Sequence, residues 1–81
     1  MRIDVRFFAV LRERAGIDRM TLETIPGATV ASAIEIVGER MPAIRPLLPR
    51  VAFALNRSYV KSDAKLNDGD ELALIPPVSG G

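Results

Sequence analysis

The spacing of apolar residues in this chain switches between two periods, and this switch restricts its fold more than any other feature. Apolar and polar residues alternate over residues 2–9 and again over residues 18–25, which is typical of half-buried strands. Between Val30 and Met41 the apolar residues recur at helical spacing instead. The positions that carry these patterns are Ile3, Val5, Phe7, Met20, Leu22, Val30, Ala33, Ile34, Val37 and Met41. The chain must therefore pack a helix against a sheet.

The connections between these segments carry their own signals. Good helix formers precede Gly16, which predicts one or two helical turns, capped by that glycine, between two antiparallel strands. Thr29 is a good N-cap for the long helix, and Pro42 ends it because proline cannot continue a helix. Residues 42–50 hold three prolines, so we expect an irregular crossing there. Its apolar side chains should plug the edge of the core: Ile44, Leu47 and Leu48.

The second half of the sequence returns to strand patterns. A third strand is predicted over residues 51–55, followed by a turn at Asn56 and a short fourth strand from Tyr59. Asp68–Gly69 is a strong turn signal, and the last strand then runs to Pro76. This order predicts a two-layer α+β fold, with a mixed sheet packed on one main helix. We expect the final strand in the sheet interior, beside the first.

Composition limits what the chain can do. Its 81 residues make one domain, and 48% hydrophobic residues are enough for a small core. The absence of cysteine and histidine removes disulfides, the usual general base and the commonest metal ligand, so we expect no metal site. A net charge of +1 argues against a nucleic-acid binder, and no apolar run is long enough to cross a membrane. We therefore expect a cytoplasmic protein without nucleic-acid or membrane partners.

Two groups of charged residues are open to a functional interpretation. The stretch "NDGDE" gathers Asp68, Asp70 and Glu71 but lacks the further ligands of a calcium loop, which favours a solvated turn. Four arginines can form a basic strip: Arg6, Arg12, Arg14 and Arg19. Ten acidic residues nearly balance the eleven basic ones, so a mixed solvated surface is the preferred interpretation.

Three apolar side chains fall outside the predicted core. Phe8 points away from the core-facing residues of the first strand, Ile75 points away from those of the last, and Tyr59 follows a turn. If the first and last strands are neighbours, Phe8 and Ile75 share one exposed face of the sheet. Single apolar residues on a surface are normal, whereas a cluster of them marks a contact patch. The pattern by itself leaves both interpretations open.

The sequence finishes with "PPVSGG", residues 76–81. Two prolines favour an extended backbone, and these six residues reach roughly 20 Å. Gly80 and Gly81 have no side chains, so they fit a channel too narrow for other residues. The carboxylate of Gly81 becomes a reactive acyl donor once it is activated, for instance as a mixed anhydride with AMP. We therefore divide the chain into a domain, residues 1–76, and an extended tail, residues 77–81.

Three stretches together resemble one family: "VRFFAVLRERAG", "ALNRSYV" and "LNDGDELALIPPVSGG". From end to end, the chain resembles the small subunit of molybdopterin synthase, which belongs to the ubiquitin-like sulfur carriers with the β-grasp fold. The last stretch is the most specific, because an acidic turn, an apolar strand, two prolines and Gly-Gly follow in one order and at one spacing. The resemblance implies a β-grasp domain with a flexible C-terminal Gly-Gly tail.

The resemblance also implies a mechanism and partners. An E1-like adenylating enzyme uses ATP to adenylate Gly81, and a sulfur donor protein converts the adenylate to a thiocarboxylate. The tail then enters the active site of the large subunit of molybdopterin synthase, and its sulfur becomes part of the molybdopterin dithiolene. A heterotetramer is expected. This chain would be a non-catalytic subunit that binds no cofactor itself. The residues inside the partner would be Val78, Ser79 and Gly80, and the docking patch would hold Phe8, Tyr59 and Ile75.

Three other interpretations are open. A sulfur carrier for thiamine thiazole synthesis shares the fold and the Gly-Gly end, but such carriers are typically shorter and lack "IPPVSGG". A ubiquitin-like protein modifier would join the activated Gly81 to lysines of target proteins. A β-grasp interaction module would bind its partners without using the tail.

Overall fold

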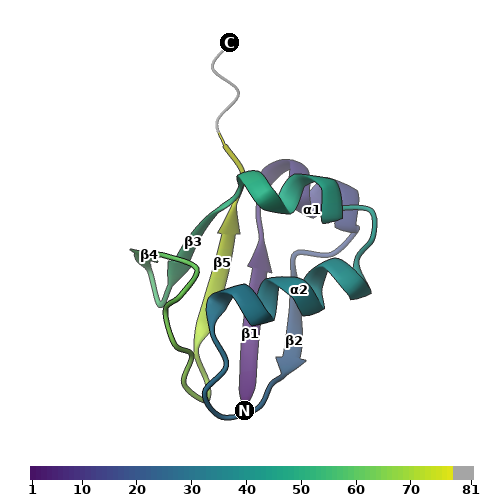
Figure 1. The fold of residues 1–81 in the computed structure, drawn as a ribbon. Helices are drawn as coiled ribbons and strands as arrows, with labels where there is room; N and C mark the ends of the chain where they lie inside the picture. Colours follow the sequence, from purple (N-terminus) through teal and green to yellow (C-terminus); the bar gives the residue numbers. More distant parts are fainter. Residues whose placement is uncertain (78–81) are drawn as a thin grey trace.

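The computed structural model describes residues 1–77. Within this range, five strands form one mixed sheet, as the alternating patterns predicted, and their order across the sheet is β2-β1-β5-β3-β4 (Figure 1). Helices α1 and α2 and the 3-10 helix η1 connect the strands. The elements are β1 (Arg2–Phe7), α1 (Ala9–Ala15), β2 (Arg19–Glu23), α2 (Val30–Arg40), η1 (Arg45–Arg50), β3 (Ala52–Leu55), β4 (Ser58–Val60) and β5 (Glu71–Ile75).

Strand β5 occupies the centre of the sheet, as predicted. It runs parallel to β1 and antiparallel to β3, so it is hydrogen-bonded on both sides. The register pairs Val5 with Leu72 and Phe7 with Leu74, which puts all four side chains on one face. Each of these side chains is at most 1% exposed. The predicted core-facing parity of the first and last strands is therefore confirmed.

Helix α2 covers this face of the sheet. Its side chains Val30, Ala33 and Val37 are fully buried and belong to the same core as the strands. Thr29 caps the helix as predicted, because its Oγ1 accepts a hydrogen bond of 3.3 Å from the Ser32 amide. The Ser32 hydroxyl returns the contact by accepting from the Thr29 amide at 2.9 Å. This reciprocal cap fixes where the helical period begins.

Residues 42–50 differ from the irregular crossing that three prolines predicted. Arg45–Arg50 form the 3-10 helix η1, with Pro46 in its first turn, where a missing amide costs no intrahelical hydrogen bond. The predicted plugging of the core is confirmed, since Ile44 and Leu48 are buried and Leu47 is half-buried. Helix η1 packs closely on α2 at Gly38, where a Cβ atom would lie 3.4 Å from Leu48 Cδ1.

Asp70 is not part of a solvated turn, contrary to the prediction. Its side chain is 7% exposed, and its carboxylate accepts hydrogen bonds from the Asn67 amide at 2.7 Å and from Asn56 Nδ2 at 2.9 Å. Asn56 lies in the turn between β3 and β4, and its Oδ1 accepts from the Glu71 amide at 3.0 Å. Asp70 thus ties the β3–β4 turn to the start of β5, which a sequence pattern of adjacent acids does not reveal.

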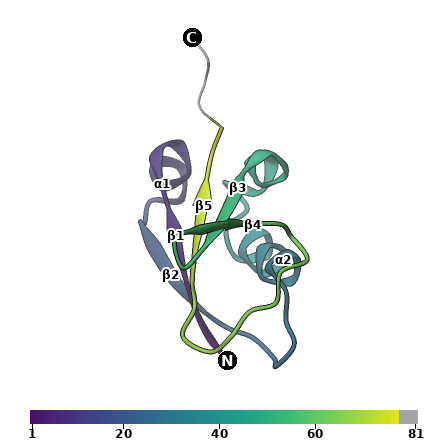
Figure 2. The same ribbon diagram turned by 90° about the vertical axis from the view of Figure 1, so that its left-hand side faces the viewer.

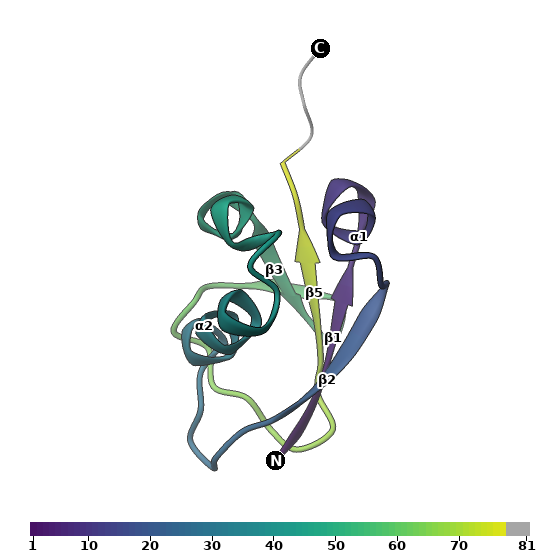
Figure 3. The ribbon, with the colours of Figure 1, turned by 90° about the vertical axis from the view of Figure 1, so that its right-hand side faces the viewer.

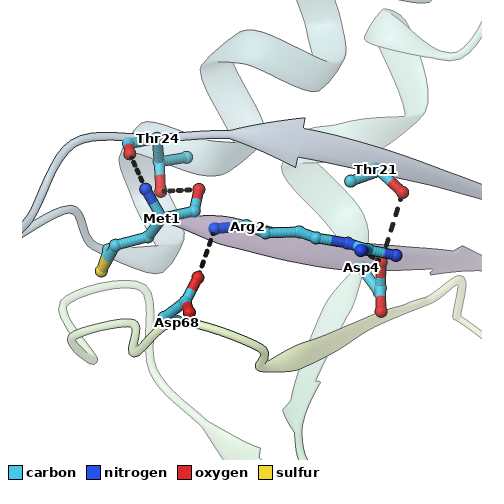
Figure 4. A network of polar contacts seen from close by, with 6 residues as sticks. All are labelled: Met1, Arg2, Asp4, Thr21, Thr24 and Asp68. Carbon is cyan, nitrogen blue, oxygen red and sulfur yellow. Dashed lines mark hydrogen bonds and ion pairs between the residues drawn. The ribbon is translucent and has the colours of Figure 1, made fainter.

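The same acidic turn holds the beginning of β1. Asp68 Oδ1 accepts a hydrogen bond of 2.8 Å from the Arg2 amide (Figure 4), and the Gly69 amide donates to the Arg2 carbonyl at 2.8 Å. On the other side of β1, the Met1 ammonium donates to the Thr24 carbonyl. The turn therefore extends the β1–β5 ladder beyond the first residue of β5.

Replacing Asp70 by alanine should lower the free energy of unfolding by roughly 1–3 kcal/mol, because two part-buried amide donors lose a charged acceptor. Asp63 is an exposed acid in the loop after β4 and serves as the matched control. Asp63→Ala should change stability by no more than about 0.5 kcal/mol. Urea denaturation of both variants measures the difference. Equal, small effects would show that Asp70 does not tie the turn to β5.

Candidate functional site

The sheet face turned away from α2, here called the outer face, carries all three apolar residues that the sequence placed outside the core. Phe8 continues β1 in an extended conformation, one residue beyond the Phe7–Leu74 pair. Extending that register by one residue puts Phe8 beside Ile75. Tyr59 pairs with Ala54, which in turn pairs with Ala73 on β5. Since Ala73 and Ile75 alternate with the core residues Leu72 and Leu74, these side chains share the outer face.

The centre of the outer face is made of small residues. Across four strands, the register aligns Arg6, Ala73, Ala54 and Tyr59 in one row. Ala73 is 9% exposed and Ala54 is 7% exposed, although both face away from α2. The larger side chains of Arg6 and Tyr59 stand at the two ends of this row. A row with small apolar residues at its centre suits an apolar group of a partner protein.

The three residues of the predicted docking patch do not form a single cluster. Phe8 is 36% exposed and lies beside the half-buried Ile75, so the structure brings these two together. Tyr59 is 75% exposed and lies on the edge strand β4. Because β5 and β3 separate β4 from β1, Tyr59 stands about 14 Å from the Phe8 side of the face, at three strand spacings. The outer face therefore has two separate apolar regions, one at Phe8 and Ile75 and the other at Tyr59, with the alanines between them.

Arg6 is a member of the outer face that the sequence interpretation missed. Its Cζ atom lies over the ring of Phe8, 5.3 Å from the ring centroid. The sequence prediction counted Arg6 as part of a mixed solvated surface. Strand alternation contained the relevant signal, because Arg6 stands two residues before Phe8 and must share its face.

The C-terminal end of β5 determines where the tail begins. Figures 2 and 3 show this end between α1 on one side of the strand and η1 on the other. Pro76 is half-buried there and Pro77 is exposed. The tail therefore starts from the strand that has neighbours on both sides, at the Phe8 end of the outer face. The predicted sites at Val78, Ser79, Gly80 and Gly81 lie outside the described residues.

Within residues 1–77, no group of three or more acidic, histidine or cysteine side chains is arranged to hold a metal ion. Nor does any helix in the same range have the length and hydropathy needed to cross a membrane.

Comparison with known proteins identifies the family. The ThiS family profile matches residues 5–81. The chain belongs to the ThiS family. Among curated relatives, the molybdopterin synthase sulfur carrier subunit of Chlamydomonas reinhardtii is 41% identical and covers 100% of both chains. The subunit of the same name from Arabidopsis thaliana is 35% identical, over 100% of this chain and 84% of its own length. The resemblance inferred from the sequence is confirmed.

Similar solved structures confirm the predicted ubiquitin-like β-grasp fold. Small archaeal modifier protein 1 from Haloferax volcanii superimposes with a TM-score of 0.93 at 28% identity, covering 100% of both chains. A putative molybdopterin converting factor subunit 1 from Pyrococcus furiosus gives a TM-score of 0.87 at 31% identity, covering 96% of this chain and 99% of its own. The complex of molybdopterin-converting factor subunits 1 and 2 from Helicobacter pylori gives 0.71 at 26% identity, with 100% coverage of both chains.

Substitution by alanine should lower stability much more at Phe7 than at the neighbouring Phe8. Phe7→Ala should cost about 3–5 kcal/mol of stability, because it empties a site in the core. Phe8→Ala should cost about 1 kcal/mol, mainly through the lost contact with Arg6. Chemical denaturation measures both values. Similar losses for the two variants would contradict the division into a core face and an outer face.

Proposed function

We propose that this chain is the sulfur carrier subunit of a molybdopterin synthase. The observation that carries the proposal is the 41% identity, over the full length of both chains, with a molybdopterin synthase sulfur carrier subunit. A further relative of the same name, from Mycobacterium tuberculosis, is 30% identical over 100% of this chain. The pair of prolines and the Gly-Gly at residues 80–81 supply what a carrier needs, which is an extended arm with a narrow, reactive tip.

The chemistry of the proposed carrier takes place at Gly81. Its carboxylate oxygen attacks the α-phosphorus of ATP on an E1-like adenylating enzyme, forming an acyl-adenylate and releasing pyrophosphate. Sulfide-level sulfur from a sulfur donor protein then attacks the acyl carbon, AMP leaves, and a thiocarboxylate remains. The thiocarboxylate sulfur attacks the pterin precursor in the large subunit, and hydrolysis of the resulting thioester by water leaves the sulfur on the pterin and restores the carboxylate. Glycine at both final positions lets the backbone approach reacting groups closely, because no Cβ intervenes.

The large subunit would dock on the outer face. This face offers apolar surface at Phe8, Ile75 and Tyr59, on either side of two nearly buried alanines. Apolar and aromatic residues of this kind are typical of the core of a protein interface. The complex from Helicobacter pylori supports a second subunit as the partner. The rigid attachment of the tail at β5 would keep Gly81 within reach of the partner's active site while the outer face holds the domain. Catalytic groups would belong to the partners, and this chain would act as the non-catalytic subunit.

The protein modifier is the alternative with a specific observation in its favour. The modifier from Haloferax volcanii has nearly the same fold, with a TM-score of 0.93. Both functions begin with the same activation of a terminal glycine and differ only in the acceptor. Curated relatives over the whole chain favour the carrier. A thiocarboxylate on the unattached chain supports the carrier, whereas a ladder of isopeptide-linked proteins supports the modifier.

Adding one alanine after Gly81 should abolish thiocarboxylate formation and leave the fold unchanged, because the reactive carboxylate is moved and no longer belongs to a glycine. The control is Ser79→Ala, which keeps both the length and the Gly-Gly tip. Intact-mass measurement after incubation with ATP, the adenylating enzyme and the sulfur donor reports the exchange of oxygen for sulfur. Thermal unfolding checks that each variant is folded. Unimpaired sulfur transfer to molybdopterin by the extended chain would contradict the mechanism.

A further inference from the structure

We infer that Arg6 and Arg19 form a carboxylate-binding site on the outer face, which the docking subunit fills with an Asp or Glu side chain set in an apolar surface. This inference rests on the proposed function, because it names what the partner must present to the outer face.

The first supporting observation is a pair of like charges. Arg6 on β1 and Arg19 on β2 are directly opposite one another in the antiparallel register. Like charges at such positions repel and lower the stability of the sheet. Within residues 1–77, an ion pair forms between Arg2 and Asp4, toward the other end of β1. The distance from Arg2 Nε to Asp4 Oδ1 is 3.8 Å. The described part of the chain therefore gives neither Arg6 nor Arg19 a carboxylate.

The second observation is a buried hydrogen-bond donor of Arg6 that has no acceptor. The Nε atom of Arg6 is buried and has no hydrogen-bond partner among the described residues. A buried N–H without an acceptor costs free energy, and neighbouring groups here do not relieve it. A carboxylate arriving from outside would draw the guanidinium away from this position and let Nε donate. One ligand therefore removes both costs, since it also neutralises the repulsion between Arg6 and Arg19.

The surroundings of Arg6 determine which carboxylate fits. The guanidinium rests on Phe8 and stands in the same row as Ala73, so an incoming acid meets apolar surface on two sides. A planar guanidinium binds a carboxylate through two parallel hydrogen bonds, and water exclusion by apolar neighbours strengthens them. This arrangement favours an acid embedded in an apolar protein surface.

Acidic residues nearby argue against a polyanion as the occupant. Asp4 lies two residues before Arg6 on the same face, and its register partner on β5 is Glu71. These two carboxylates would repel the repeated phosphates of a nucleic acid, while a single side chain placed over Arg6 avoids them. The site therefore selects one local negative charge.

The test is the affinity of the large synthase subunit from the same organism for Arg6 variants of this chain, measured by titration calorimetry at low and high salt. Arg6→Leu should weaken binding at least tenfold, because the partner's buried acid loses its ion pair. The affinity of Arg6→Lys should lie between those of the unaltered chain and of Arg6→Leu, since lysine keeps the charge but lacks the planar guanidinium group. Arg40→Leu is the matched control: it removes an exposed arginine of α2, away from the outer face, and should bind like the unaltered chain.

A second readout separates docking from a structural role. The melting temperature of Arg6→Leu should stay close to that of the unaltered chain, because the loss of the contact with Phe8 is offset by removal of the repulsion from Arg19 and of the unpaired buried donor. Salt should weaken binding of the unaltered chain more than binding of Arg6→Leu. Unchanged affinity and salt dependence in Arg6→Leu would overturn the inference, and so would a marked loss of thermal stability. If the unaltered chain does not bind the large subunit at all, the proposed function is wrong and the inference falls with it.

Discussion

The pairing of β5 with β1 on one side and β3 on the other is the constraint on which the rest of the structure depends. A strand held at both edges and nearly buried on both faces does not shift its register easily, because a shift of one residue would put Leu72 and Leu74 on the outer face. The same alternation sends Ala73 and Ile75 to the outer face. The five residues of β5 therefore contribute to the core, form the centre of the proposed docking surface and connect directly to the tail.

The two ends of β5 differ in a way that matches this role. At its start, Asp70 and Asn56 bind the β3–β4 turn to the strand, and Asp68 binds the backbone of β1. At its other end, the strand leads out between α1 and η1 (Figures 2 and 3), and the following residue, Pro76, is half-buried. The start of β5 is thus held by hydrogen bonds to two neighbouring segments, while its end leads into residues that a partner must reach. A carrier requires this combination, because the domain must stay fixed on the partner while the tail delivers its terminal group to the partner's active site.

The sequence predicted the features that depend on periodicity and missed those that depend on tertiary pairing. Alternation placed Ile3, Val5 and Phe7 in the core and Phe8 opposite them, and the proline after β5 correctly ended the sheet. The burial of Asp70 could not be predicted, because its partner Asn56 is fourteen residues away and is brought near only by the β3–β5 register. The pairing of Arg6 with Arg19 likewise needed the β1–β2 register, and three prolines concealed the 3-10 helix. The wide separation of Tyr59 from Phe8 followed from strand order, which parity does not give.

The central claim is that Gly81 carries sulfur to a pterin in the partner subunit. The most direct test mixes this chain, prepared with a thiocarboxylate at Gly81, with the large synthase subunit and cyclic pyranopterin monophosphate. The intact mass of the chain and the pterin product are then followed together. The account predicts that sulfur leaves Gly81 as molybdopterin appears. A thiocarboxylate that persists beside a large subunit shown to be active with another carrier would contradict it, and would direct the search to a different sulfur acceptor.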